Sequence, residues 1–290
     1  MHFLLFSNVN KDPDQSITDR LEKILDRSGG RPERSLILGT GARLSIAGGQ
    51  NKLPALVRSG RILLPEPGSW APTNAVLKAQ HPVCPGLHRN EMYCMRLAAG
   101  IGLPAAECTL MRVGRWEMYV TRRYDREESG GRIRRIHQED FCQALGVLPD
   151  RKYEALGGPG FRQCIDLMYR SGMESLSEAL KNFLKCAVFN CIIGNGDAHA
   201  KNFSLLCNNG AVRLAPFYDL VCTRAYRWLS SGMAMRWGQP PAHDDDPQGA
   251  WQEMASACRV GKDAMRGIIE NVSAAVRASF QDVASDEISR

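Results

Sequence analysis

The sequence predicts an α+β protein with two lobes, a small β-rich lobe followed by a larger helical lobe. From residue 36 to about 125, short apolar runs are broken by glycine and proline, which is typical of strands. After residue 131, apolar residues recur at helical spacing over longer stretches. A length of 290 residues suits this organisation. We therefore expect an N-terminal flank at 1–40, a small lobe at 41–126 and a helical lobe at 127–290.

The first part of the chain contains one helix in the flank, several short strands and a second helix. The flank helix runs from Ser16 to Leu25 and ends before Gly29 and Gly30. A helix over 90–99 is expected because its apolar residues repeat at helical spacing. The strand candidates are 43–46, 53–57, 61–64, 74–78 and 118–121.

The helical lobe begins after a polar segment at 127–131, whose two glycines predict a turn. Two short strands are expected at 203–206 and 212–214. The predicted helices of this lobe are 139–145, 161–169, 176–193 and 264–280. No internal repeat is visible, so a solenoid is not expected.

The composition is that of a folded protein and excludes several classes. The ten cysteines form no C-x-x-C pair, so neither a zinc site nor a disulfide framework is expected. No export signal and no run of about 20 apolar residues is found, and we expect a cytoplasmic protein without membrane contact. The net charge of +6 fits an ordinary solvated surface or one that meets phosphate-bearing or nucleic-acid partners. Charge alone does not separate these alternatives.

The strongest chemical signal is the segment from Asp197 to Asn202, which follows a predicted apolar helix, and the aspartate at 219 after the two short strands. Phosphoryl transfer needs a carboxylate to orient or deprotonate the attacking hydroxyl. It also needs carboxylate and amide oxygens to hold Mg²⁺. We predict Asp197 as the catalytic residue and Asn202 and Asp219 as metal ligands. An isolated D-x-x-x-x-N pattern would more often be a turn, but the flanking helix and hairpin favour catalysis.

Two further side chains of this segment belong to the predicted catalytic set. His199 taken alone is expected to hold the loop in place and not to act as an acid or base. Lys201 either stabilises the transferred phosphate or faces solvent.

The small lobe offers candidates for binding ATP. Lys78 ends a predicted strand, where it can meet the α- and β-phosphates, and Glu91 at the start of the next helix is its expected partner. A glycine-bearing loop follows the first strand candidate, and its backbone N–H groups can approach a phosphate closely, although a plain hairpin turn has the same composition. It matches neither G-x-x-x-x-G-K-[ST] nor G-x-G-x-x-G. Its predicted ATP-binding residues are Ser45, Ala47, Gly48, Gly49, Gln50 and Lys52.

Taken together, these motifs resemble the HipA-like serine/threonine kinases of bacterial toxin–antitoxin systems. The similarity runs in family order from about residue 41 to 224. It rests on the stretches 45–52, 72–78, 90–94, 123–126, 138–146, 152–154 and 157–160, the Asp197 loop and 214–219.

The resemblance implies a bilobal protein-kinase-like fold, of the PI3/4-kinase-like HipA type, that uses ATP and Mg²⁺. It implies the same roles for Asp197, Asn202, Asp219 and Lys78. It adds an adenine-binding hinge and makes Ser45 an autophosphorylation site that switches the kinase off. A phosphoserine adds about two negative charges where ATP phosphates bind. The hinge residues are Thr121, Arg122, Arg123 and Tyr124.

The resemblance also implies partners. These are a HipB-like helix-turn-helix antitoxin, operator DNA reached only through that antitoxin, and an aminoacyl-tRNA synthetase as substrate. Only about forty residues precede the phosphate loop, so the chain is more similar to the compact HipT-type kinases. Their missing subdomain is supplied by a separate small HipS-like protein. The synthetase is then the glutamyl or the tryptophanyl enzyme. Asn51 and Arg122 depart from the family pattern, where acidic residues are common.

Two alternatives remain open at the level of sequence. One is a small-molecule phosphotransferase of the aminoglycoside or choline kinase type, which shares the Asp-to-Asn spacing. The other is a catalytically silent scaffold for an antitoxin. The Ser45 loop argues against a small-molecule phosphotransferase. The scaffold is disfavoured because the polar residues predicted for catalysis and for ATP binding are all present.

Overall fold

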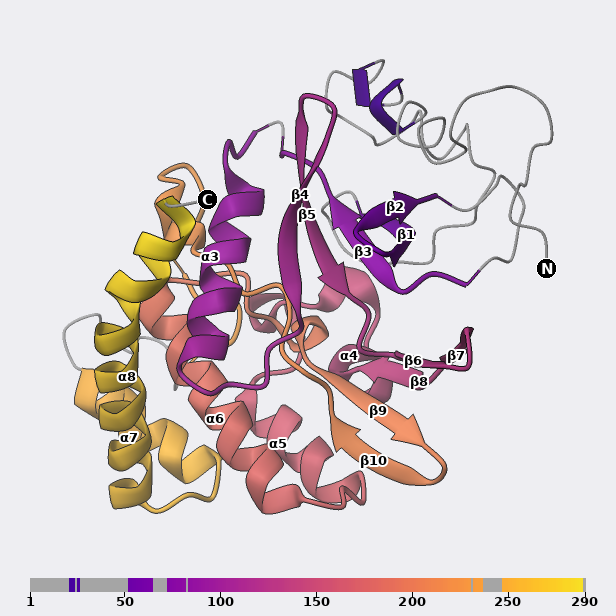
Figure 1. The fold of residues 1–290 in the computed structure, drawn as a ribbon. Helices are drawn as coiled ribbons and strands as arrows, with labels where there is room; N and C mark the ends of the chain where they lie inside the picture. Colours follow the sequence, from indigo (N-terminus) through magenta and orange to yellow (C-terminus); the bar gives the residue numbers. More distant parts are fainter. Residues whose placement is uncertain are drawn as a thin grey trace, which may run out of the picture. The chain divides into compact units, whose positions relative to one another are not determined.

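The computed structural model describes residues 21–23, 25–26, 52–64, 72–81, 83–230, 232–236 and 247–288 (Figure 1). The chain divides into two compact units, which are described separately. The first comprises residues 1–92 and 106–135, and the second comprises 93–105 and 136–290. Helix α3 (Leu87–Gly100) contributes residues to both. The lobe boundaries expected from the sequence stay a prediction.

The first unit contains a five-stranded antiparallel sheet in the order β2-β1-β3-β5-β4. Strands β1 and β2 are joined by the two-residue turn Ser59–Gly60, and both turn residues have positive φ, 51° and 74°. That geometry matches the right-handed twist of the strands on either side. The bounds are β1 Lys52–Arg58, β2 Arg61–Leu63, β3 Ala75–Lys78, β4 Cys108–Val113 and β5 Trp116–Arg122.

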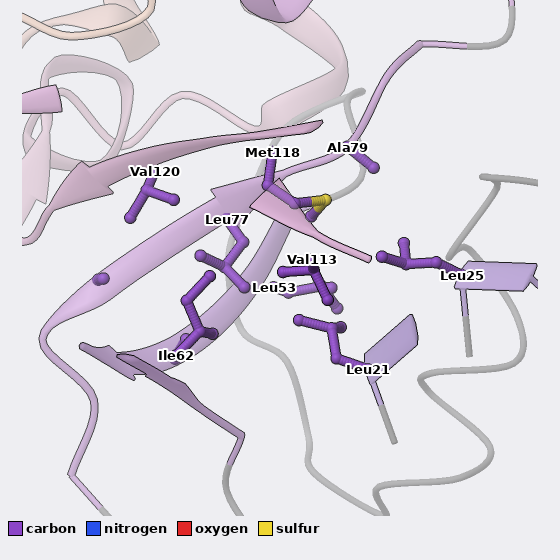
Figure 2. Close-up of a cluster of buried hydrophobic side chains, with 11 residues drawn as sticks. Leu21, Leu25, Leu53, Ile62, Leu77, Ala79, Val113, Met118 and Val120 are labelled. Atoms are coloured by element: carbon purple, nitrogen blue, oxygen red, sulfur yellow. The ribbon is translucent and has the colours of Figure 1, made fainter. Parts of the chain in front are cut away.

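One face of this sheet carries the core of the first unit (Figure 2). Alternate residues of the strands point into it, because side chains of a strand alternate between its two faces. The described part of the predicted flank helix, residues 21–23 and 25–26, is helical. Its two leucines, four positions apart, are at most 1% exposed. The cluster comprises Leu21, Leu25, Leu53, Ala55, Ile62, Ala75, Leu77, Ala79, Val113, Met118 and Val120.

A separate hairpin follows the sheet, formed by β6 (Arg126–Ser129) and β7 (Arg132–Arg135). The sequence-based prediction of a turn over 127–131 is therefore too broad, because only Gly130 and Gly131 lie between the paired strands. Charged residues face one another across the strands, as in the pair Glu127 and Arg134. Without apolar alternation, such strands give no hydrophobic signal.

The second unit contains a three-stranded sheet, β8 (His137–Asp140), β9 (Ser204–Asn208) and β10 (Ala211–Leu214), in the order β10-β9-β8. The predicted helix at 139–145 is wrong at its start, since helix α4 covers only Phe141–Ala144. Asp140 caps it. Its carboxylate accepts the N–H of Gln143, and the Gln143 side chain accepts the N–H of Asp140. This capping box fixes where the strand ends and the helix begins.

The helices of the second unit include the long predicted ones. Helix α5 (Phe161–Arg170) and helix α6 (Leu176–Ile193) lie within a residue of their predicted bounds. Helix α7 (Pro247–Ala257) was not predicted, and α8 (Lys262–Ile288) extends beyond its predicted range. Helix α8 packs along α6 and α7 (Figure 1). Short 3-10 helices lie at Pro149–Arg151 (η1), Glu154–Leu156 (η2), Ala200–Asn202 (η3) and Thr223–Ala225 (η4).

Two absences bear on earlier predictions. All ten cysteines lie in the described part of the chain, where each is a free thiol. Across the described ranges, no helix combines the length and the apolar character needed to span a bilayer.

Candidate active site

The Asp197 loop begins where helix α6 ends. Gly194 closes the helix in the left-handed conformation, with φ of 70°. Asn190, in the last turn of α6, accepts a hydrogen bond at 2.9 Å from the side-chain amide of Asn195. The side-chain oxygen of Asn195 in turn accepts the N–H of Asp197 at 3.2 Å. Asn190 and Asn195 are at most 2% exposed, so this chain of amides ties the start of the loop to the helix.

A second tie comes from Thr223, at the start of η4. Its hydroxyl donates to the carbonyl of Gly194 at 3.0 Å and accepts the N–H of Gly196 at 2.7 Å. Gly196 has no room for a side chain, because an added Cβ would lie 2.8 Å from the carbonyl of Gly232. The backbone immediately before Asp197 is therefore held from two directions.

The carboxylate of Asp197 is asymmetric in its contacts. Its Oδ1 accepts a hydrogen bond from the hydroxyl of Tyr153 at 2.7 Å, and Nε2 of His199 lies 3.8 Å from the same oxygen. Its Oδ2 has no hydrogen-bond partner within the described ranges, and the side chain is 46% exposed. Burial raises the pKa of Tyr153, and the hydrogen bond to Asp197 raises it further, so the hydroxyl remains a donor at neutral pH. One oxygen is thus held and the other faces outward.

His199 is buried beside this carboxylate. Its ring packs edge-on against Tyr153, with the ring centroids 5.4 Å apart. Among the described residues, neither ring nitrogen has a hydrogen-bond partner. Burial lowers the pKa of His199, although the negative charge of Asp197 opposes this shift. The lowered pKa favours a neutral imidazole. This packing agrees with the expectation that His199 holds the loop, although its role stays a prediction.

Lys201 lies in a buried ion pair. Its Nζ is 2.6 Å from Oδ2 of Asp140, and the two side chains are 8% and 9% exposed. Asp140 is also the residue that caps helix α4. Of the two alternatives left open by the sequence, the solvent-facing one is wrong. The other, contact with a transferred phosphate, stays a prediction.

The two predicted metal ligands lie on segments that are hydrogen-bonded to each other. The side-chain N–H of Asn202 donates to the main-chain carbonyl of Asp197 at 2.9 Å. The hydroxyl of Tyr218 donates to the carbonyl of Lys201 at 2.8 Å, which joins the segment before Asp219 to the one before Asn202. Asp219 itself adopts φ of 56°, a left-handed conformation that aspartate tolerates better than most residues.

The donor set of these two residues fits Mg²⁺. Because the nitrogen of the Asn202 amide is engaged, its oxygen is the group left to face a ligand, and it accepts no hydrogen bond within the described part of the chain. The other residue offers a carboxylate. Mg²⁺ is commonly held by one or two such protein oxygens, together with water and substrate phosphates.

In the first unit, Lys78 and Glu91 form a buried ion pair. Nζ of Lys78, at the end of β3, lies 2.5 Å from Oε1 of Glu91 on α3, and each side chain is 3% exposed. The contact expected from the sequence is therefore present. Lys52, at the start of β1, is the direct cross-strand partner of Lys78. Directly opposed residues share one face of a sheet, so both lysines lie on the same face.

The predicted hinge lies at the end of β5. The backbone N–H of Arg122 donates to the main-chain carbonyl of Glu107 at 2.8 Å. The backbone N–H of Arg123 donates to the main-chain carbonyl of Asn74 at 2.7 Å. These two N–H groups are thus already used within the protein. The side chain of Arg123 binds Asp125 through two hydrogen bonds of 2.9 and 2.7 Å. Burial would raise the pKa of Asp125, but Arg123 and Arg126 together hold it below its ordinary value.

The remaining predicted ATP-binding residues, namely Ser45, Ala47, Gly48, Gly49 and Gln50, lie outside the described residues. In the other direction, the structure adds residues that sequence reasoning had not assigned to the site. Tyr153, Asp140 and Thr223 all contact it. Tyr153 had a weak signal, because it lies in one of the stretches that resemble the HipA-like kinases, but no local pattern ties it to Asp197.

Comparison with known proteins identifies the family. Residues 44–280 match the model described as HipA-like C-terminal domain. The chain is 41% identical over 266 residues to a Sinorhizobium fredii protein named "Putative kinase Y4mE", covering 90% of this chain and 62% of that protein. It is 34% identical over 209 residues to "Serine/threonine-protein kinase toxin HipA" of Shewanella oneidensis, covering 67% of this chain and 46% of the toxin. The chain thus spans about half to three fifths of these relatives.

The fold agrees with this match. A solved complex of HipA and HipB with operator DNA from Shewanella oneidensis contains a chain that superposes with a TM-score of 0.77. That match covers 92% of this chain and 64% of the other, at 23% identity. The predicted mixed α and β kinase-like fold is confirmed. By its sequence and its fold, the chain belongs to the family defined by the HipA-like C-terminal domain.

Proposed function

We propose that the chain is an ATP-dependent serine/threonine protein kinase. The observation that carries the proposal is the arrangement of Asp197 and Asn202. One carboxylate oxygen of Asp197 is held by Tyr153 while the other accepts no hydrogen bond from the described residues, and the amide nitrogen of Asn202 is bonded within the loop, which leaves the amide oxygen for a ligand. A carboxylate directed at an acceptor hydroxyl and a hard oxygen ligand five residues away are what phosphoryl transfer requires.

In this proposal, Oδ2 of Asp197 accepts the proton of the attacking serine or threonine hydroxyl. The oxygen of that hydroxyl forms the new bond to the γ-phosphorus of ATP, and the bond to the leaving ADP oxygen breaks. Asn202 and Asp219 hold Mg²⁺, which when bound neutralises charge on the phosphates. Tyr153 and His199 stay beside the other carboxylate oxygen and keep its direction fixed.

The first unit is proposed to bind the phosphates of ATP. Two lysines opposite each other on one sheet face would repel one another. A triphosphate supplies the negative charge that such a pair favours. Glu91 fixes the position of the Lys78 ammonium, as an ion pair of this kind does in protein kinases.

We further propose that the kinase is the toxin of a HipBA- or HipBST-type system. The name of the Shewanella relative and the HipB present in the solved complex support this role. The proposed partners are a HipB-like antitoxin and a HipS-like small protein, with DNA reached through the antitoxin. The proposed substrate is an aminoacyl-tRNA synthetase, the glutamyl or the tryptophanyl enzyme, and Ser45 is the proposed autophosphorylation site.

The test is phosphate incorporation measured by mass spectrometry. The purified chain is incubated with ATP and Mg²⁺, alone and with a panel of aminoacyl-tRNA synthetases. We expect one phosphate at Ser45 and transfer to one synthetase, and neither with Asp197→Gln. Binding of ATP without any transfer to protein would overturn the kinase proposal. Transfer to a synthetase with Ser45 unmodified would overturn only the self-modification.

A parallel incubation with kanamycin or choline separates the small-molecule alternative. Transfer to either compound, with none to protein, would favour a small-molecule phosphotransferase. Absence of ATP binding would favour the scaffold. Among the residues that the structure describes, no contact favours either alternative.

A further inference from the structure

We propose that Tyr153 is the residue that positions the catalytic carboxylate, by holding one oxygen of Asp197 so that the other is directed at the acceptor hydroxyl. This inference rests on the proposed kinase function and deepens it. Tyr153 is a positioning residue in this scheme, because its hydroxyl contacts Asp197 and not the reacting atoms.

The contacts around Asp197 divide cleanly between its two oxygens. Tyr153 donates to Oδ1 at 2.7 Å, and the His199 ring lies on the side of that same oxygen at 3.8 Å. Oδ2 accepts no hydrogen bond from the described residues. A side chain that is 46% exposed has freedom to rotate unless a bond of this kind restricts it. A hydrogen bond to a charged acceptor is among the stronger ones in proteins.

Several hydrogen bonds hold the segment that carries Tyr153. Tyr153 caps the 3-10 helix η2, and its carbonyl accepts the N–H groups of Leu156 and Gly158, both at 2.9 Å. Its neighbour Glu154 accepts the N–H of Arg236 at 2.6 Å. The Tyr153 ring packs edge-on against the His199 ring and also contacts Nζ of Lys152, which is 4.8 Å from the Tyr153 ring centroid. A hydroxyl on so constrained a ring can set the direction of a carboxylate.

The backbone that surrounds Gly158 leaves no room for a side chain at this position. A Cβ added at Gly158 would lie 2.3 Å from the carbonyl of Arg151 and 2.8 Å from that of Tyr153. Both atoms are backbone, so a methyl group there forces the segment to move. The substitution Gly158→Ala therefore displaces the Tyr153 hydroxyl without removing it.

The contact also permits the opposite interpretation, in which the tyrosine hydroxyl imitates the substrate hydroxyl and blocks the site. In that case, Tyr153 would have to leave before an acceptor binds, and its removal would accelerate the reaction. The one-sided contacts favour positioning, because the outward oxygen remains accessible while the tyrosine is bound.

The experiment compares wild type with Tyr153→Phe, which keeps the ring packed on His199 and removes only the hydroxyl. Initial rates of phosphate incorporation into the chain itself and into dephosphorylated casein are measured over a range of ATP concentrations. We expect kcat to fall about 10- to 100-fold, because a hydrogen bond to a charged group is lost. The KM for ATP should stay within about twofold, because the Tyr153 hydroxyl is bonded to Asp197, which is proposed to act on the acceptor hydroxyl and not to bind the nucleotide. Gly158→Ala should show the same division between kcat and KM.

The matched control is Tyr169→Phe on helix α5. Its hydroxyl makes no hydrogen bond within the described ranges, and the side chain is 42% exposed, so its rate should equal that of wild type. In an Asp197→Ala background, where no carboxylate is left to position, Tyr153→Phe should change the residual rate by less than about twofold.

The outcomes separate the inference from the proposed function. If wild type transfers phosphate and Tyr153→Phe is equally fast, the tyrosine does not position the base. If Tyr153→Phe is faster, the blocking interpretation is correct and ours is overturned. If wild type transfers no phosphate to either acceptor, the kinase proposal fails first. A loss that appears equally in the Asp197→Ala background would make the effect structural and would also contradict the inference.

Discussion

Nζ of Lys78 and Oε1 of Glu91 lie 2.5 Å apart, and neither side chain is more than 3% exposed. Removing one partner of a buried ion pair strands the other charge in a poorly solvated place. We expect Glu91→Ala to lower the free energy of unfolding by about 3–5 kcal/mol, measured by urea denaturation at pH 7. The double replacement Lys78→Met with Glu91→Leu should cost less than Glu91→Ala alone.

The control for this prediction is Arg266→Ala, which removes an exposed ion pair with Asp263 on helix α8. Its cost should be below about 1 kcal/mol. Equal losses in the free energy of unfolding for Glu91→Ala and Arg266→Ala would show that the buried pair contributes no more to stability than an exposed pair.

Asp219→Asn should change the requirement for Mg²⁺. The substitution keeps the size of the side chain but removes the negative charge from a proposed ligand. We expect the free Mg²⁺ concentration for half-maximal phosphate transfer to rise by at least about tenfold. Rates measured over a series of Mg²⁺ concentrations at fixed ATP test this. An unchanged Mg²⁺ dependence would remove Asp219 from the metal site.

Asp140→Asn should destabilise the second unit more than loss of the helix cap explains. The amide keeps an oxygen that can accept the N–H of Gln143, but the Lys201 ammonium loses its buried counter-charge at 2.6 Å. We expect a loss of about 3–5 kcal/mol in the free energy of unfolding. Gln143→Ala, which removes only the reciprocal capping bond, should cost no more than about 2 kcal/mol. If both variants cost the same, the Lys201 pair is not a structural element.

Stability should fall as the pH drops below 6.5, partly because of His88. Burial lowers the pKa of His88, against the opposing hydrogen bond and charge of Glu117, while Arg89 lowers it further. In the unfolded chain, His88 takes up a proton near its ordinary pKa of 6.5, but in the folded chain it does so only at lower pH. The unfolded state therefore binds more protons in this window, and the folded state loses stability there.

The variant His88→Gln cannot take up that proton. It should make the decline shallower below pH 6.5, by up to about 1.4 kcal/mol per pH unit. Unfolding free energies at pH 7.5, 6.5 and 5.5 measure the slope. Since the pKa of His199 is lowered in the same direction, some decline should persist in the variant. An identical slope in both proteins would show that His88 does not contribute to the decline in stability.

The sequence predicted those parts of the fold that depend on local apolar spacing. Helices α5 and α6 were located within a residue because they carry long apolar faces and end at glycine or polar residues. Strand β4 was missed because only Val113 of its residues is buried. Strands β6 and β7 consist mainly of charged residues and have no apolar alternation. The last two residues of β8, Glu139 and Asp140, were assigned to the start of the following helix, because polar residues are common at both positions.

The same distinction applies to the site. Asp197 and Asn202 were predicted from their spacing on one loop, and Lys78 and Glu91 from their positions on neighbouring elements. The contact of Tyr153 with Asp197 joins residues 44 positions apart, and that of Asp140 with Lys201 joins residues 61 apart. No local pattern marks such pairs, because only the folded chain brings them together.

The hydroxyl of Thr223 contacts the backbone on both sides of Asn195. A single oxygen atom thus fastens the stretch before Asp197 to η4. A displacement of Thr223 would therefore shift the backbone before Asp197 without any contact to the Asp197 carboxylate.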